Sequence, residues 1–402
     1  KVEQSLESCM EEFYKLTGRK YGLISTYEMD DAEYAIVGMG SMIETAEAAV
    51  DYLREEKNIK VGIVHVTSFR PFPGKQLTKA LHRVRAISIL ERMDNPLAES
   101  NPLTTEIKAA LADNIQRDKS GKMKIPKIFS GSAGLGSRDV RPDDIIAVVD
   151  NMIKDKKKYF AIGIDHELGL PTKDSTDIRP EGTFSMRGHS VGGYGSVTTN
   201  KIIATIVADL FDMYVQAYPK YGSEKKGLPT TYYLTVSPSH VKTHNELEFV
   251  EFVPLNDLNA FNLANPLNGI MPDGMIFVQT QKTSHSDIWS DIPQWAQKII
   301  QKKKIKIFAL DTVKIAKDVS SQPDLIQRMQ GIVLLGIFLK ATPFLDRSGI
   351  SEEELMISVE RSLRKYFGKR GEQVVKDNLN CVKRGFKEVF EVTQPHAEEV
   401  LS

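Results

Sequence analysis

The stretch Arg187–Lys201 reads RGHSVGGYGSVTTNK, and the rest of the chain is organised around it. Four glycines lie between Gly188 and Gly195, and an amphipathic run from Ile202 to Phe211 follows at once. Glycine lets backbone N–H groups turn toward a ligand because no Cβ stands in the way. A helix that starts behind such a loop adds unpaired N–H groups and the positive end of its dipole. The stretch therefore predicts a seat for a phosphate or another anion.

The side chains around this loop favour the same interpretation. Ser196, Thr198 and Thr199 supply hydroxyl groups, and Lys201 supplies a positive charge. The stretch is not a P-loop, because the G-K-[ST] ending is absent. The alternative interpretation is a tight turn that only leads the chain into a helix.

Composition limits the classes of protein to which the chain can belong. A length of 402 residues suggests two or three domains, and 41% hydrophobic with 26% charged residues indicates a packed globular protein. A net charge of zero argues against nucleic acid or an anionic membrane as the main partner. Two cysteines, Cys9 and Cys381, cannot form a disulfide framework or a zinc or iron–sulfur site.

The same features indicate where the protein works. We expect a cytoplasmic protein, because no apolar run reaches the ~20 residues of a membrane span and no secretory signal is visible. The sequence begins at Lys1 without methionine, which suggests an excised piece or a processed product.

The first half of the chain alternates strands with helices, which is typical of a parallel sheet with crossover helices. We expect strands at 35–41, 61–66, 86–90 and 127–131, and helices at 1–20, 42–56, 75–81, 103–113 and 142–154. Gly38-Met39-Gly40 resembles part of a dinucleotide fingerprint, but it lacks the third glycine and a later acidic strand end. Glu91-Arg92 lies at the end of a strand, a position that could hold a ligand, although an ion pair across a domain interface is the simpler expectation.

A polar segment rich in Gly, Pro and Asp follows, and a second alternating pattern comes after it. We expect strands at 230–236, 249–253, 274–278 and 305–310, and helices at 257–263, 293–302, 324–340, 351–367 and 371–390. The predicted fold class is α/β with two doubly wound domains. The predicted parts are a leading helix at 1–20, a first domain at 21–155, a connector at 156–186 and a second domain at 187–402.

Several motifs, in order, resemble one known family. The first domain carries VTSFRPFPG at 66–74, AISILER at 86–92 and GSRDV at 136–140. The second carries GGYGSVT at 192–198, NK at 200–201, YPKYGSEKKG at 218–227 and KRGEQVV at 369–375. The chain resembles the central portion of the pyruvate:ferredoxin (flavodoxin) oxidoreductases, within the 2-oxoacid:ferredoxin oxidoreductases. The resemblance implies a transketolase C-terminal-like domain followed by a gamma domain.

The resemblance also implies an activity. Such enzymes oxidise a 2-oxo acid with loss of CO2, pass electrons through 4Fe–4S clusters to ferredoxin or flavodoxin, and release an acyl-CoA. Thiamine diphosphate supplies the carbanion chemistry. The thiamine-binding and cysteine-rich cluster domains of the family are missing from this sequence, so the chain alone is expected to be incomplete and inactive. The implied partners are those domains or subunits, ferredoxin or flavodoxin, and a second copy of the full enzyme.

The resemblance implies that the gamma domain takes part in coenzyme A binding, and our hypothesis places this binding at the glycine-rich stretch. The expected contacts are the backbone amides of Gly192, Gly193, Gly195 and Ser196, the hydroxyls of Thr198 and Thr199, and the charges of Lys201 and Arg187. A second loop, at Gly222 and Ser223, is a further candidate. The alternatives are a solvated Lys201, a plain surface turn at 221–225, and a structural rather than ligand-binding His189. No catalytic residue or metal ligand is predicted.

Two other functions stay open from the sequence. One is a stand-alone module that binds coenzyme A or a nucleotide. The other is a scaffold whose two domains only hold other subunits. The sequence does not select the oxo acid, because the family's substrate contacts lie mostly on the missing domains.

Overall fold

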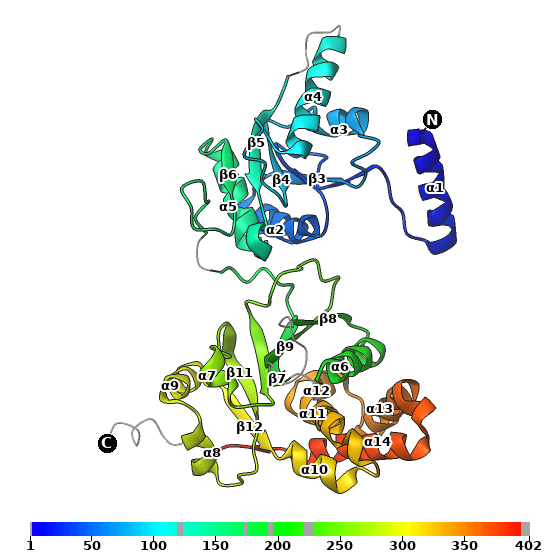
Figure 1. Ribbon diagram of the computed structural model, residues 1–402, viewed down its shortest axis with the longest axis vertical. Coiled ribbons are helices and arrows are strands. Elements are labelled where there is room, and N and C mark those ends of the chain that lie inside the picture. The colour runs from blue at the N-terminus through cyan, green and yellow to red at the C-terminus, as the bar shows by residue number, and fades with distance from the viewer. Residues whose placement is uncertain (1, 119–123, 173–174, 192–195, 221–228, 395–402) are drawn as a thin grey trace. The chain divides into compact units, whose positions relative to one another are not determined.

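The chain forms two compact units. The computed structural model describes residues 2–118, 124–172, 175–191, 196–220 and 229–394 (Figure 1). Unit 1 comprises Lys1–Arg179 together with Lys242–Glu246, and unit 2 comprises Pro180–Val241 together with Leu247–Ser402. The division falls within the connector predicted for 156–186, which also contains a short strand of the first sheet and the start of the second sheet's first strand.

Unit 1 is built on a six-stranded sheet with the order β1-β3-β2-β4-β5-β6. Its strands are β1 (Ile24–Tyr27), β2 (Tyr34–Gly38), β3 (Val61–Val66), β4 (Ala86–Glu91), β5 (Lys127–Ser132) and β6 (Tyr159–Ala161). All neighbours are parallel except β1, which runs antiparallel to β3. The residues of β4 are buried throughout, as expected for a strand covered on both faces.

Helices cover both faces of this sheet. They are α2 (Met42–Lys57), α3 (Gly74–Leu81), α4 (Pro102–Arg117) and α5 (Pro142–Ile153). The cores show that α2 and α5 pack on one face and α3 and α4 on the other. This confirms the doubly wound fold predicted for the first domain. The leading helix α1 (Val2–Thr17) has no buried residue, and Glu3 accepts a hydrogen bond of 2.8 Å from Gln76 on α3.

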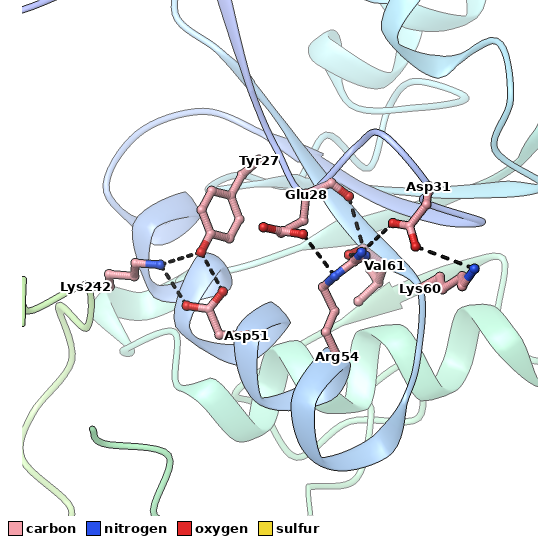
Figure 2. A network of polar contacts seen from close by, with 8 residues as sticks. All are labelled: Tyr27, Glu28, Asp31, Asp51, Arg54, Lys60, Val61 and Lys242. Atoms are coloured by element: carbon pink, nitrogen blue, oxygen red, sulfur yellow. Dashed lines mark hydrogen bonds and ion pairs between the residues drawn. The ribbon is translucent and has the colours of Figure 1, made fainter. Parts of the chain in front are cut away.

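A polar network binds residues 242–246 into unit 1 (Figure 2). The Lys242 ammonium donates to Tyr27 Oη and to Asp51 Oδ2, each at 2.7 Å, and Tyr27 donates to Asp51 Oδ1 at 2.6 Å. The same ammonium lies 4.3 Å from the centre of the Tyr27 ring. Although burial opposes the charge, the hydrogen bonds to Asp51 and Tyr27 raise the pKa of Lys242.

The network continues along α2 and its neighbours. Arg54 donates to the Val61 carbonyl at 2.9 Å and pairs with Glu28 at 3.1 Å and with Asp31. The amide of His244 donates to Thr45 Oγ1 at 3.1 Å. These contacts are local to unit 1, and they explain why five residues distant in sequence belong to it.

Unit 2 is built on a seven-stranded sheet with the order β13-β12-β11-β10-β7-β9-β8. Its strands are β7 (Phe184–Val191), β8 (Tyr214–Lys220), β9 (Pro229–Ser237), β10 (Val250–Leu255), β11 (Ile270–Gln279), β12 (Lys306–Leu310) and β13 (Phe390–Glu391). β7, β10, β11 and β12 are parallel, whereas β8, β9 and β13 pair antiparallel with their neighbours. The predicted α/β class is confirmed, with an antiparallel margin on each side.

Helices also cover both faces of the second sheet. They are α6 (Ser196–Phe211), α7 (Ala260–Leu263), α8 (His285–Asp291), α9 (Gln294–Lys303), α10 (Thr312–Val319), α11 (Ile326–Ala341), α12 (Phe344–Ser348), α13 (Glu352–Phe367) and α14 (Glu372–Glu388). α7, α8 and α9 share one core with the sheet, and α6 with α10–α14 share the other. Figure 1 shows α7 and α9 on one side of this sheet and α6 with α11, α13 and α14 on the other.

In the structure, the stretch Arg187–Lys201 is divided between a strand and a helix at other positions than predicted. Arg187–Val191, expected to begin the glycine-rich loop, form the second half of β7, which pairs with β9 on one side and β10 on the other. Helix α6 includes Ser196–Lys201, which the sequence placed before the helix. The reason is burial: Ser196, Thr199 and Asn200 lie at helical spacing and face the interior.

Candidate functional site

The carboxyl ends of β7 and β10 form the candidate site. The two strands are parallel neighbours, with His189 opposite Leu255. After β7 the chain passes to the face covered by α6 and α11, whereas after β10 it passes to the face covered by α7. In open α/β sheets ligands bind in the crevice where such connections diverge. We call Ser190, Ser196–Lys201 and Asn256 the strand-end site.

Asn256 is held at the end of β10 by two hydrogen bonds. Its amide donates to the His189 carbonyl at 2.9 Å, and its Oδ1 accepts from the Tyr232 hydroxyl at 3.1 Å. Burial raises the pKa of Tyr232, so this hydroxyl stays protonated and remains a donor. The Tyr232 ring lies over Gly188, where an added Cβ would stand 1.9 Å from a ring carbon. Glycine at 188 is thus required for the tyrosine to reach Asn256.

Three buried side-chain atoms around this site have no hydrogen-bond partner in the part of the chain that the structure describes. They are His189 Nε2, Ser190 Oγ and Asn200 Oδ1. Burial, with the positive charge of Arg187, lowers the pKa of His189 to about 4, so its imidazole is neutral at pH 7. His189 and Ser190 are neighbours on β7, so their side chains face opposite sides of the sheet, and the Asn200 amide contacts Tyr233, the β9 partner of Arg187.

The predicted binding residues on α6 divide into two pairs. Ser196 and Thr199 are buried, whereas Thr198 and Lys201 are exposed. The exposed pair stands in the first two turns of the helix, where an anion can reach both the ammonium and the helix start. The predicted contacts at Gly192, Gly193, Gly195, Gly222 and Ser223 lie outside the described residues.

Arg187 lies in the middle of β7 and is buried. Its guanidinium donates to the carbonyls of Leu247 and Pro266, each at 3.1 Å, and to the carbonyl of Asn268. Arginine is suited to such multiple contacts because its donors form a rigid fork. The side chain therefore connects β7 with the segments that precede and follow β10 in the sequence. Its positive charge is buried next to β7.

Sequence reasoning missed Ser190, Asn200 and Asn256 as site residues. Asn256 carries a recognisable signal, because it follows directly on the last apolar residue of a buried strand. Asn200 stood in the quoted stretch, yet only the structure shows that it is buried and that its Nδ2 donates to the Tyr233 carbonyl at 2.8 Å.

The first sheet also has a cavity at its carboxyl edge, of about 440 Å3. Its polar side chains pair with one another: Ser132 donates to Asp94 at 2.8 Å, and Asn101 donates to Ser132 at 3.2 Å. Nearby, the Glu91 carboxylate accepts from the amides of Leu103 and Thr104 at 2.6 and 3.1 Å. Glu91 therefore caps α4, whereas the ion pair expected of Glu91-Arg92 at a domain interface stays a prediction.

Comparison with known proteins gives two matches to family models. The model described as pyruvate ferredoxin/flavodoxin oxidoreductase matches residues 185–388, about half of the chain. The model described as pyruvate:ferredoxin oxidoreductase core domain II matches residues 32–145. The two matches follow the order of the two sheets.

Individual relatives are similar to nearly the whole chain. The pyruvate:ferredoxin oxidoreductase of Moorella thermoacetica is 31% identical over 391 residues, covering 96% of this chain and 32% of the relative. The probable pyruvate-flavodoxin oxidoreductase of Escherichia coli is 28% identical over 408 residues, covering 98% and 33%. Among solved structures, the pyruvate oxidoreductase subunit PORC of Thermotoga maritima is 20% identical with a TM-score of 0.38, covering 52% of this chain and 99% of that one.

The chain spans about a third of the length of the curated relatives it matches. Within the described ranges, no helix is long and apolar enough to cross a membrane. The described residues also hold no group of three His, Cys, Asp or Glu side chains placed to bind a metal ion.

Proposed function

Because the chain belongs to the pyruvate ferredoxin/flavodoxin oxidoreductase family, we propose that it contributes the coenzyme A site to an enzyme that oxidises pyruvate or a related 2-oxo acid. The product would be an acyl-CoA, with ferredoxin or flavodoxin as the electron acceptor. The observation that carries the proposal is the strand-end site, where the connections after β7 and β10 diverge to opposite faces of the sheet beside a helix start.

Charge and position support coenzyme A at this site. Its phosphates require positive charge and N–H donors, and Lys201 with the start of α6 offers both. Thr198 adds an exposed hydroxyl one turn before Lys201, while Ser196 and Thr199 shape the inner side of the helix start. Arg187 contributes its charge from behind β7 and does not serve as a direct ligand in this proposal.

The redox groups of the family do not fit this chain. A 4Fe–4S cluster needs four cysteine thiolates, and the sequence has only Cys9 and Cys381. Burial raises the pKa of the Cys381 thiol to about 12, which keeps it protonated. We therefore assign the clusters, and with them thiamine diphosphate, to other domains or subunits of a dimeric cytoplasmic enzyme.

The experiment compares two lysine variants of the complete enzyme by calorimetric titration with coenzyme A. Lys201→Ala removes an exposed ammonium from the helix start, and Lys298→Ala removes another exposed ammonium from α9. We expect Lys201→Ala to weaken coenzyme A binding about fivefold, equivalent to ~1 kcal/mol, since the charge is solvent-accessible. Lys298→Ala should leave the affinity unchanged.

Equal affinities in the two variants would remove Lys201 from the site. If the complete enzyme fails to bind coenzyme A at all while retaining its fold, the scaffold function would replace the one proposed here.

A further inference from the structure

The cavity at the carboxyl edge of the first sheet offers polar groups that the rest of the described chain leaves unused. We propose that it binds the vicinal hydroxyl groups of a sugar ring, either in a simple riboside or in the ribose of a nucleoside. The cavity measures about 440 Å3, which lies within the range of small-molecule sites. Its residues all belong to unit 1, so the proposal is independent of the coenzyme A site proposed for unit 2.

The lining of this cavity comes from the ends of three neighbouring parallel strands. On β5 and β6, Ser130 is the register partner of Tyr159, so the two side chains share one face of the sheet. That face is the one covered by α4, because the Ser130 hydroxyl lies 3.1 Å from the Thr104 hydroxyl. The loop 94–101, which follows β4, and the segment 164–168, which follows β6, complete the lining. Ligands of open α/β sheets bind outside such carboxyl ends.

A buried chain of hydrogen bonds fixes the Asp94 carboxylate at this cavity. The Asn101 NH2 group donates to the Ser132 hydroxyl at 3.2 Å, and Ser132 donates to Asp94 Oδ1 at 2.8 Å. Asn101 and Ser132 are buried, whereas Asp94 is exposed and its Oδ2 has no hydrogen-bond partner among the described residues. The two oxygens of a carboxylate can accept from two neighbouring hydroxyls. An acidic side chain holds the ribose of dinucleotides in the same way.

Two further side chains of the lining suit a sugar ring. Tyr159 is 39% exposed, so its ring can pack against the apolar face of a sugar. The amide of Leu168 donates to His166 Nδ1 at 3.2 Å, so the neutral imidazole carries its proton on Nε2. That N–H group can donate to a ring or hydroxyl oxygen of the ligand. The cavity therefore combines an acceptor, a donor and an aromatic surface.

The charges around the cavity favour a neutral ligand. The carboxylates of Asp94 and Glu99 belong to its lining and would repel an anion. The ammonium groups of Lys108 and Lys158 lie 6.0 and 5.4 Å from the centre of the Tyr159 ring and would oppose a cation there. A neutral ring with hydroxyl donors meets the Asp94 carboxylate without either conflict.

The test uses Asp94→Asn, with Asp165→Asn as the matched control, in the complete enzyme. Asp94→Asn keeps one oxygen to accept from Ser132 and replaces the unpartnered Oδ2 by an amide donor. Asp165 is also exposed but does not line the cavity. The probes are adenosine and methyl ribofuranoside, each compared with its 2-deoxyribose counterpart, which lacks the vicinal hydroxyl pair. Titrations followed by ligand-detected NMR measure the affinities.

We expect Asp94→Asn to weaken binding of both ribosides about tenfold and Asp165→Asn to leave it unchanged. The deoxy counterparts should bind the parent about tenfold more weakly, which tests the same contact without changing the protein. Binding of adenosine alone would support the site with a nucleoside as its ligand, and equal binding of methyl ribofuranoside would support it with the sugar alone. Undiminished binding to Asp94→Asn, equal binding of the deoxy counterparts, or no binding of either riboside would overturn the proposal. Coenzyme A carries a phosphate on its ribose 3′ oxygen and should bind Asp94→Asn as it binds the parent, so failure here leaves the proposed function standing.

Discussion

The Lys242 side chain binds residues that lie far from it in the sequence. Its ammonium is shared between the Asp51 carboxylate and the Tyr27 hydroxyl, and its side chain is 25% exposed. Such a partly buried ion pair is stronger than a surface pair because less solvent screens it. The contact ties residues 242–246 to α2, as Figure 2 shows.

We predict that Lys242→Met lowers the free energy of unfolding of unit 1 by about 1 kcal/mol, because the change leaves Asp51 half-buried without its cation. Chemical denaturation at pH 7 measures the change. Lys60→Met is the control, because Lys60 is more exposed and pairs with Asp31 only at 3.5 Å. A loss in Lys60→Met as large as in Lys242→Met would contradict the account.

The same variant has a predicted pH dependence. The pKa of Lys242 is raised above its ordinary 10.5 in the folded state, so its stabilising effect is complete below that pH. The effect disappears as the pH rises through the folded pKa, where the ammonium loses its proton. The difference in stability between the parent and Lys242→Met should therefore be constant from pH 7 to about 10 and shrink above it.

The start of helix α4 is held by a side chain from the preceding strand. The first N–H groups of a helix lack partners within it, and here the Glu91 carboxylate fills that role from the end of β4. The Thr104 hydroxyl donates to the same carboxylate at 2.9 Å. The helix start is thus fixed to the strand that precedes it, and Asn101, the residue just before the helix, lines the neighbouring cavity.

We predict that Glu91→Ala destabilises unit 1 by about 2 kcal/mol, the upper range for the loss of a helix cap, because two amides and a hydroxyl lose their acceptor. Glu99→Ala, which removes an exposed carboxylate from the following loop, should change the stability by less than about 0.5 kcal/mol. Thermal and denaturant unfolding of both variants measure this. A neutral Glu91→Ala would show that the carboxylate does not support α4.

Elements with strong apolar patterns were predictable from the sequence. β3 was predicted with its observed bounds, and α2, α9 and α13 within one residue at each end. β8 was missed because it lies at an edge, is only partly buried and contains Pro219. β7 was missed because its Gly, Ser and His residues have low strand preference, and its identity depends on pairing with β9 and β10.

At the scale of the whole molecule, the family match confirms the resemblance that the motifs suggested, in the same domain order. The helix after the glycine-rich stretch was predictable, since the stretch does lead into α6, while the binding contacts proposed there stay a prediction. The place of Asn256 was not predictable, because it lies beside His189 only through the pairing of β10 with β7, and Lys242–Glu246 join unit 1 across a long stretch of sequence. Contacts between segments so far apart in the sequence become visible only in the folded structure.

Hydrogen–deuterium exchange of the complete enzyme, with and without coenzyme A, tests the central claim most directly. Amides in a ligand site gain protection when the ligand binds. The account predicts added protection at Ser190, at Ser196–Lys201 and at Asn256, with none around Asp94 and Asn101 between β4 and α4. Protection confined to the first sheet, or absent from the start of α6, would contradict it.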